Sequence, residues 1–233
     1  MLNAFVTLVL AAVPVIVAIT LHEAAHGYAA LALGDTTARE AGRLSLNPLR
    51  HVDRVGTLLL PGLLILGQVL TIGRVTFMFG WAKPVPVSAW KFRYPRQGMA
   101  FVAAAGPAMN FALAWLTAVA MHATADIPGA TGDMVDQTLD LFLLSNLVLG
   151  LFNLLPIPPL DGGRIMVGIL PERLAFAWAR LERAGIVIVV LGVFLLPRLF
   201  AEFGINWNPV GNTLGTVLPW AYDVVRHLAG WHV

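Results

Sequence analysis

The sequence has no cysteine and few charged residues, which make up 12% of its 233 residues. The lack of cysteine excludes disulfides, thiolate nucleophiles and cysteine-ligated metal sites, so a protein-bound metal would need His, Asp or Glu ligands. Soluble globular chains carry about 25% charged residues, about twice the share found here. Nucleic-acid-binding chains have dense runs of basic residues, and this sequence has no such run. Because 58% of the residues are hydrophobic and the mean hydropathy is +0.77, the sequence predicts an integral membrane protein without a nucleic-acid partner.

Long hydrophobic stretches predict an all-α polytopic membrane protein. A spanning helix needs about 20 apolar residues. The stretches that meet this need lie at about 2–33, 99–123, 139–156 and 186–203. We expect residues 1–203 to form one core, and residues 204–233 to form an interfacial or amphipathic tail whose aromatic residues suit a membrane surface.

Basic residues are unevenly distributed and predict a topology. Nine of the 15 Lys and Arg lie between Gly34 and Gly98 and four between Pro159 and Arg183, whereas residues 124–138 contain none. The positive-inside rule places the basic segments in the cytoplasm and the N-terminus outside. The apolar segment 55–73 would then begin and end in the cytoplasm as a re-entrant segment. An additional plain span is the alternative.

The first predicted span contains the motif His22-Glu23-x-x-His26. Two histidines at i and i+4 lie on one helical face, as two ligands of one zinc ion require, and the intervening glutamate can take a proton from a metal-bound water. Charged residues at the centre of a span cost about 2.5–3.5 kcal/mol each, so this cluster needs a compensating partner. The motif therefore predicts a metal site.

A catalytic zinc takes three protein ligands, so a third ligand is needed. Asp161 is the candidate, because it follows the span 139–156 in a segment rich in proline and glycine. A solvated loop after a proline-terminated helix is the alternative interpretation. Eight residues separate His26 from Gly34, or about 12 Å of helix, which places the site within the bilayer near its cytoplasmic face.

Three motifs together resemble the site-2 protease family of intramembrane zinc metalloproteases, especially its small prokaryotic members without PDZ or CBS domains. The motifs are His22-Glu23-x-x-His26, Ala105-Gly-Pro-x-x-Asn110 and Phe152-Asn153-Leu-Leu-Pro-x-Pro-Pro-Leu-Asp161-Gly-Gly. The likeness covers Leu21 to about Arg164. What the resemblance implies is that one zinc ion per chain is bound by His22, His26 and Asp161, and that Glu23 is the catalytic acid and base.

The resemblance also implies that Asn110 and Asn153 lie near the substrate or the reaction intermediate, where either could donate a hydrogen bond to the developing oxyanion. For Asn110, ordinary hydrogen bonding between helices is equally compatible with the sequence. It further implies a prokaryotic cell membrane, the inner membrane, as the location.

Residues 74–88 predict a small cytoplasmic β hairpin, because apolar residues alternate from Val75 through Phe77 to Phe79 before a turn. A transmembrane substrate must be unwound before its peptide bonds are accessible. We expect the hairpin edge at Val75 and Phe77 to hold the extended substrate strand. An amphipathic interfacial hairpin without a substrate role is the alternative.

The sequence therefore predicts an endopeptidase that uses zinc to hydrolyse peptide bonds in or near transmembrane segments. Its partners would be the lipid bilayer and a membrane-protein substrate with a transmembrane helix. The alternative is a metal-binding membrane protein without proteolytic activity, either a transporter or an inactive scaffold. Glu23 favours hydrolysis, because a site that only binds metal needs no carboxylate between its histidines.

Overall fold

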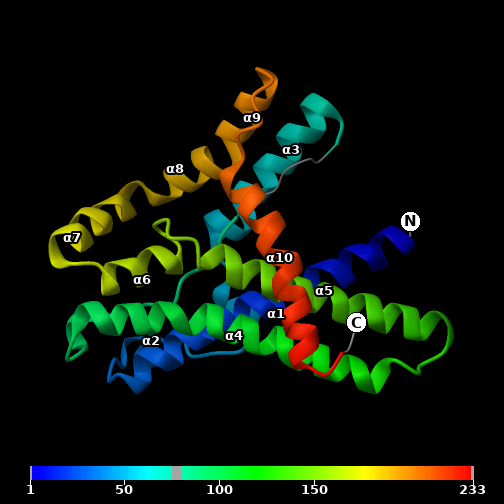
Figure 1. Ribbon diagram of the computed structural model, residues 1–233, viewed down its shortest axis with the longest axis horizontal. Coiled ribbons are helices and arrows are strands. Elements are labelled where there is room, and N and C mark those ends of the chain that lie inside the picture. The colour runs from blue at the N-terminus through cyan, green and yellow to red at the C-terminus, as the bar shows by residue number, and fades with distance from the viewer. Residues whose placement is uncertain (1, 75–79, 232–233) are drawn as a thin grey trace.

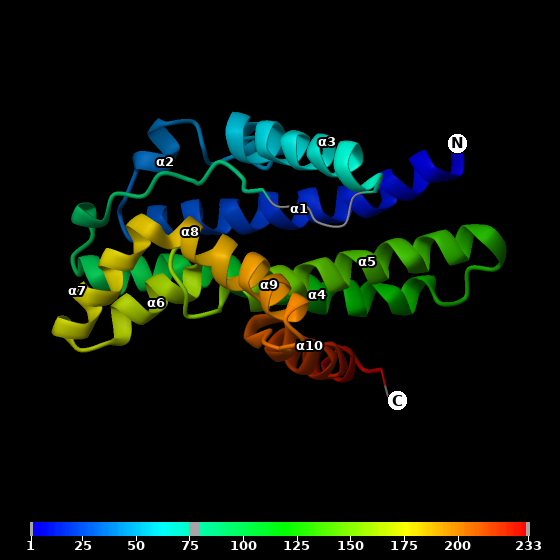
Figure 2. The ribbon, with the colours of Figure 1, turned by 90° about the horizontal axis from the view of Figure 1, so that it is seen from above.

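A computed structural model of the chain describes residues 2–74 and 80–231, and within this part every regular element is helical (Figure 1). Three long helices, α1 (Leu2–Ala32), α4 (Pro95–Thr124) and α5 (Gly129–Asn153), pack against one another and form the core (Figure 2). Short helices connect the longer ones: α2 (Thr37–Glu40), η1 (Pro48–His51), η3 (Ala89–Lys91) and α6 (Asp161–Ile169).

Five helical segments of the described residues are long and apolar enough to cross a membrane: Ala12–Ala32, Arg54–Ile72, Pro95–Thr124, Gly129–Asn153 and Glu172–Glu202. This confirms the predicted all-α polytopic membrane fold. No strand occurs in residues 2–74 or 80–231. The predicted hairpin at 74–88 therefore has no counterpart in its described part, and its residues 75–79, with Val75 and Phe77, lie outside the described residues.

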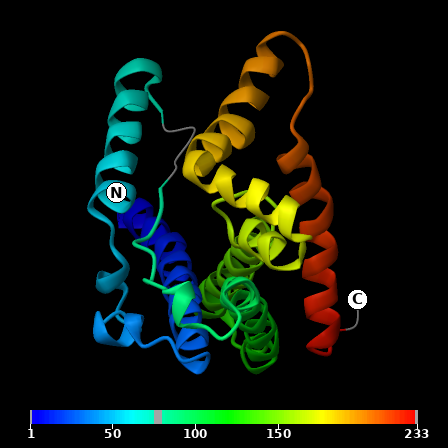
Figure 3. The same cartoon turned by 90° about the vertical axis from the view of Figure 1, so that its left-hand side faces the viewer.

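Two of the five segments are compound helices that project to the same side of the core (Figure 3). One consists of a π-helical stretch, η2 (Arg54–Leu59), and α3 (Leu60–Ile72). The other consists of α7 (Glu172–Arg180), η4 (Leu181–Ala184), α8 (Gly185–Val189), the π-helical η5 (Val190–Leu195) and α9 (Leu196–Glu202). Each π-helical stretch ends two residues before a proline, Pro61 or Pro197, because the missing proline N–H interrupts the regular ladder.

The chain leaves the core through η2 and α3 and then returns to the residues at which this segment began. The main-chain N–H of Trp81 donates to the Gly56 carbonyl (3.1 Å), and that of Lys83 donates to the His51 carbonyl (2.8 Å). Gly56 admits the Trp81 indole, since a Cβ there would lie 2.4 Å from ring atoms. A re-entrant segment requires this geometry, and its placement in the membrane stays a prediction.

The helices extend beyond the hydrophobic stretches that predicted them. The segment between α4 and α5 comprises only residues 125–128, so Asp133 and Asp136 lie on α5 instead of in a loop. Similarly, the last span begins its helical course at Glu172, well before residue 186. Hydropathy detects only the apolar part of a helix that can lie in lipid, so it does not detect polar turns at the helix ends.

The C-terminal segment forms α10 (Pro209–Leu228), which crosses α4 and α5 (Figure 1). The Trp231 indole N–H donates to the Ala118 carbonyl (2.8 Å), and the Tyr222 hydroxyl donates to the Asp140 carboxylate (3.0 Å). These two aromatic residues thus fix the tail to the core, whereas Trp220 is 65% exposed. The expectation of aromatic residues at a membrane surface fits Trp220 better than Tyr222 or Trp231.

Asp35, shortly after α1, ties this helix to the chain that returns from α3. Its buried carboxylate accepts hydrogen bonds from the main-chain N–H of Thr37 (2.9 Å) and of Ser88 (2.6 Å), and Lys91 Nζ lies 3.4 Å away. Burial alone would raise the pKa of the Asp35 carboxyl, but these hydrogen bonds favour its charged form and hold the pKa below its usual range. The ionised carboxylate therefore clamps two distant parts of the chain together.

Asp35→Asn is expected to lower the free energy of unfolding by about 1–3 kcal/mol at pH 7, because the new amide must point its NH2 group at other donors. Since the folded-state pKa is lowered, the native carboxylate stabilises the fold above its unfolded pKa of about 3.9, and this contribution is lost as the pH falls through the folded value. Thermal unfolding in detergent should show a difference between native chain and variant that shrinks on acidification.

The control for this prediction is Asp126→Asn, which changes an exposed carboxylate. It should unfold with the native chain at every pH. A difference between native chain and Asp35→Asn that is the same at pH 7 and pH 3 would contradict the clamp.

Candidate metal centre

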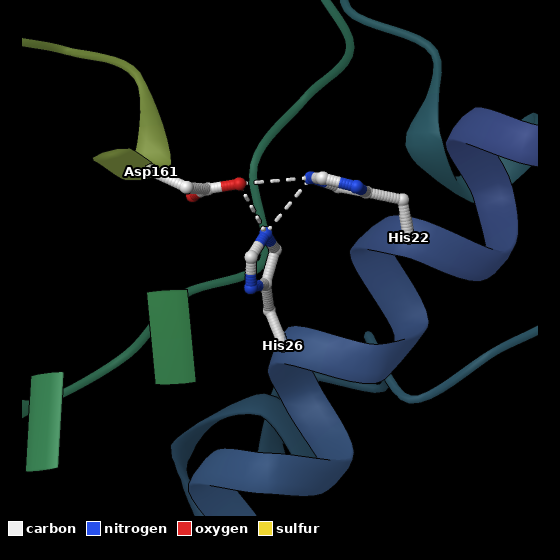
Figure 4. A group of neighbouring side chains, drawn as sticks. All are labelled: His22, His26 and Asp161. Carbon is white, nitrogen blue, oxygen red and sulfur yellow. Dashed lines mark hydrogen bonds and ion pairs between the residues drawn. The ribbon is translucent and has the colours of Figure 1, made fainter. Parts of the chain in front are cut away.

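The side chains of His22, His26 and Asp161 converge on one point inside the protein (Figure 4). Both histidines lie on α1, and Asp161 is the first residue of α6. The His22 and His26 Nε2 atoms are 3.1 Å apart, and Asp161 Oδ2 lies 3.1 Å from the first and 3.4 Å from the second. The structure thus brings together all three predicted metal ligands.

The other ring nitrogen of each histidine faces an oxygen. His22 Nδ1 lies 2.5 Å from the carboxamide oxygen of Asn110, and His26 Nδ1 lies 2.7 Å from the main-chain carbonyl of Val102. Both oxygens accept, so each Nδ1 carries a proton, and a neutral imidazole then has its lone pair on Nε2. Asp161 Oδ2 is buried and has no hydrogen-bond donor.

This donor set fits a zinc ion. Ligand atoms at about 2.0–2.1 Å from a tetrahedral zinc lie about 3.3 Å from one another, close to the observed separations of 3.1–3.4 Å. Two nitrogen lone pairs and a carboxylate oxygen repel one another at this distance unless a proton or a metal cation lies between them. Three protein ligands also leave the fourth position of a tetrahedral ion for water.

Gly106 of α4 forms the floor under the two imidazoles. A Cβ at this position would lie 2.5 Å from His26 Cε1 and 2.6 Å from His22 Cε1 and Nε2. These separations are far inside van der Waals contact, so only glycine leaves both rings where they are. The motif Ala105-Gly-Pro-x-x-Asn110 thus supplies a floor through its glycine and a hydrogen-bond acceptor through its asparagine.

A tightly folded loop presents Asp161. Its successor Gly162 has no room for a side chain, since a Cβ would lie 2.2 Å from the Leu154 carbonyl oxygen. The helix that Asp161 begins is anchored at its other end by Arg96 of α4, which donates to the Leu170 carbonyl (2.9 Å). Gly168 of α6 packs directly on Ala100 of α4. The third predicted ligand is therefore held in position by α4, like the two histidines.

Glu23 lies beside the three predicted ligands and lines the same cavity, which has a volume of about 440 Å³. Its carboxylate accepts a hydrogen bond from the main-chain N–H of Val85 (3.1 Å). Arg43, itself buried, donates to the neighbouring Lys83 carbonyl (2.7 Å) and so holds this part of the returning chain in place. Glu23 is thus positioned next to the candidate metal site with one oriented hydrogen bond.

The two predicted asparagines occupy different places. Asn153 lines the cavity, where its Nδ2 donates to the Leu149 carbonyl of its own helix (3.0 Å). Asn110 is fully buried behind His22, and its Nδ2 faces the oxygens of Asn146 (2.9 Å) and Ala18 (3.5 Å). The geometry therefore supports the interhelical alternative for Asn110 and leaves Asn153 as the oxyanion candidate.

The sequence interpretation missed Asn146 and the role of Gly106. A signal for Asn146 was present, because it is a polar residue in the middle of the apolar stretch 139–156, where an unpaired amide is costly. No local signal distinguishes Gly106 from other helical glycines. Its role depends on which side chains another helix places against it.

Comparisons with known proteins agree on one family. The profile of Peptidase family M50 matches residues 125–196. YwhC of Bacillus subtilis, named as a candidate zinc metalloprotease, is 40% identical over 189 residues, which cover 79% of this chain and 80% of YwhC. Two proteins named Rip2 carry the same kind of name. Rip2 of Mycobacterium tuberculosis is 31% identical over 189 residues, which cover 81% of this chain and 67% of that protein. Rip2 of Mycolicibacterium smegmatis is 32% identical over 189 residues, which cover 80% of this chain and 68% of that protein. No solved structure gives a significant match to the chain.

Proposed function

Because the chain belongs to peptidase family M50, we propose that it is an intramembrane zinc endopeptidase that hydrolyses peptide bonds in or near the transmembrane segments of other membrane proteins. Its family, the names of its relatives and its apolar helices make it a multi-pass membrane zinc metalloprotease. The proposal adds the intramembrane substrate and the residues that act on it.

One observation carries the proposal: three ligand atoms 3.1–3.4 Å apart lie next to a glutamate that shares their cavity. In this proposal His22, His26 and Asp161 hold one zinc ion per chain. A bound zinc ion would lower the pKa of a coordinated water to about 7 and polarise the scissile carbonyl. Glu23 would take a proton on its carboxylate and return it to the leaving amine.

Asn153 completes the proposed machinery. It lies on the cavity wall near the end of α5, and a carboxamide N–H at this place can donate to the oxygen on which negative charge develops. Asn153 Nδ2 donates one hydrogen bond, to the Leu149 carbonyl, which leaves its second amide hydrogen for this role.

The returning chain at residues 80–88 is proposed to hold the substrate. It runs without helical turns along α1 (Figure 2), and Trp81, Pro84, Val85 and Val87 line the cavity. An extended main chain beside the cavity can pair with an unwound substrate strand. The earlier candidates Val75 and Phe77 belong to the same hypothesis but precede this segment.

A membrane location supports an intramembrane substrate. His26 lies six residues before the end of α1, or about 9 Å along the helix, so the site would lie inside the bilayer near one face. The surrounding excess of Lys and Arg supports the cytoplasmic face of a prokaryotic inner membrane.

The transporter alternative receives no support from the other histidines. A transporter needs ligands along a path, whereas within the described chain one group of side chains converges, at His22, His26 and Asp161. His51 faces the Ser45 carbonyl (2.8 Å), and His122 stacks on Trp231 with ring centroids 4.2 Å apart.

The proposed ligand set is tested by metal content. We expect detergent-purified native protein to contain about one zinc per chain by mass spectrometry, and Asp161→Ala to contain far less, because a two-histidine site lacks the third ligand. Asp133→Ala, which removes an exposed carboxylate from α5, should retain zinc like the native chain. Equal zinc in the native chain and Asp161→Ala, or a native chain without zinc after zinc-supplemented purification, would refute the site.

A further inference from the structure

Asn146 is a fully buried amide in the apolar part of α5, and the proposed chemistry does not use it. It does not line the cavity. Burying an amide in a membrane helix is costly unless its donors and acceptor are paired. The partners of the Asn146 amide therefore indicate its role.

Asn146 is the middle of a chain of hydrogen bonds that ends at a proposed zinc ligand. Asn146 Nδ2 donates to the Phe142 carbonyl one turn earlier on α5 (2.8 Å). Asn110 Nδ2 donates to Asn146 Oδ1 (2.9 Å), and Asn110 Oδ1 faces His22 Nδ1 (2.5 Å). The chain thus connects helices α5, α4 and α1.

The direction of this chain is fixed at its far end. A main-chain carbonyl such as that of Phe142 can only accept, so Asn146 must turn its NH2 group toward it and its oxygen toward Asn110. Asn110 must then turn its own NH2 group toward Asn146 and its oxygen toward His22. The His22 imidazole is left with one arrangement, in which Nδ1 carries the proton and Nε2 has the free lone pair that faces Asp161.

The two histidines differ in what orients them. His26 Nδ1 faces a main-chain carbonyl, that of Val102, which cannot become a donor. The partner of His22 is a carboxamide, which can rotate and present its NH2 group instead of its oxygen. If Asn110 rotated in this way, the His22 proton would move to Nε2, and the ring could not bind a metal there. The orientation of His22 therefore depends on the groups that prevent this rotation, which are Asn146 Oδ1 at 2.9 Å from Asn110 Nδ2 and the more distant Ala18 carbonyl at 3.5 Å.

We propose that Asn146 is a positioning residue that, through Asn110, holds His22 in the tautomer that binds zinc. The inference rests on the proposed function, since it assigns a role to Asn146 only if His22 is a zinc ligand. Hydrogen-bonded partners of metal ligands typically change metal affinity by about 10–100-fold when removed. Asn146 acts one step further from the ligand, so we expect the lower end of this range.

The test is zinc affinity measured by competition with a chelator. Asn146→Leu, which keeps the approximate shape of the side chain, is expected to weaken zinc binding about tenfold, and Asn110→Leu at least as much. Combining the two is expected to weaken binding no more than Asn110→Leu alone, because both act through one hydrogen bond to His22. Effects that multiply in the double variant would indicate independent packing defects and overturn the proposal.

Two further variants separate positioning from folding. Leu147→Ala removes a fully buried side chain from the neighbouring position of α5, so it should lower thermal stability while zinc affinity stays native. Asn146→Asp keeps an oxygen facing Asn110 in either protonation state, so it should bind zinc nearly as well as the native chain. An Asn146→Asp variant that binds zinc as weakly as Asn146→Leu, or an Asn146→Leu variant with native affinity, would overturn the proposal.

The outcomes also distinguish this proposal from the proposed function. If the native chain binds zinc, Asp161→Ala does not, and Asn146→Leu matches the native chain, the zinc site stands and the role of Asn146 is wrong. If the native chain binds no zinc, the proposed function fails and the role of Asn146 fails with it.

Discussion

Glu23→Gln is expected to abolish peptide hydrolysis while bound zinc remains at the native level. Glutamine has the size of glutamate and its carbonyl oxygen can still accept from the Val85 N–H, so the cavity and the returning chain should keep their geometry. It cannot take a proton at neutral pH. Loss of general acid–base catalysis typically costs about 10²–10⁴-fold in rate, which would leave cleavage undetectable in most assays.

The measurement for Glu23→Gln pairs cleavage of a membrane-protein substrate in proteoliposomes with zinc content of the same preparation. Glu40→Gln, on the short helix α2 and away from the cavity, is the control and should cleave like the native chain. Cleavage by Glu23→Gln at more than about a tenth of the native rate would show that another group moves the proton. Loss of zinc in this variant would mean that Glu23 supports the metal site and not the proton transfer.

Gly106→Ala is expected to reduce both zinc binding and hydrolysis sharply. The added methyl group would lie 2.5–2.6 Å from the two imidazoles, so one or both rings must move by about an ångström. Misplacing groups by this amount costs about 100-fold in rate where geometry is critical. Glycine to alanine in a helix otherwise stabilises the helix by about 1 kcal/mol, so the loss should occur in a protein that is still folded.

A matched glycine is available to test this reasoning. Gly67 of α3 is also helical, but a Cβ there would meet no atom within 4 Å. Gly67→Ala is therefore expected to retain zinc and activity, measured by metal analysis and substrate cleavage alongside Gly106→Ala. Native zinc content in Gly106→Ala would contradict the close packing of α4 against the two histidines.

The part of the site that lies within one helix could be predicted from the sequence. His22 and His26 are one turn apart on α1, so their spacing alone indicates a shared ligand, and Glu23 falls between them for the same local reason. Asp161 could also be predicted, because a carboxylate in a proline- and glycine-rich segment directly after an apolar stretch is unusual. The convergence of all three residues is what this pattern predicted.

The part of the site that depends on contacts between helices could not be predicted in the same way. The floor at Gly106 and the acceptors from Asn110 and Val102 all lie on α4, about 80 residues further along the chain than the two histidines. The sequence alone places no α4 residue against a particular turn of α1. The return of the chain from α3 to Gly56 likewise depends on a tertiary contact. The polar helix ends that lie outside the apolar stretches could not be predicted because they give no hydropathy signal.

Every proposed metal ligand is held in place by α4, and this limits which helices can move independently of the site. His22, His26 and Asp161 are each held by α4, directly or through α6, so they form one rigid unit with it. In the part of the chain that the structure describes, only 6% of the most apolar stretch of Arg54–Ile72 is buried, and α3 makes no extensive contact with α1, α4 or α6. A displacement of α3 would therefore leave the three proposed ligands and their supports in place, so entry of a proposed substrate beside α3 and retention of a bound ion would depend on different helices.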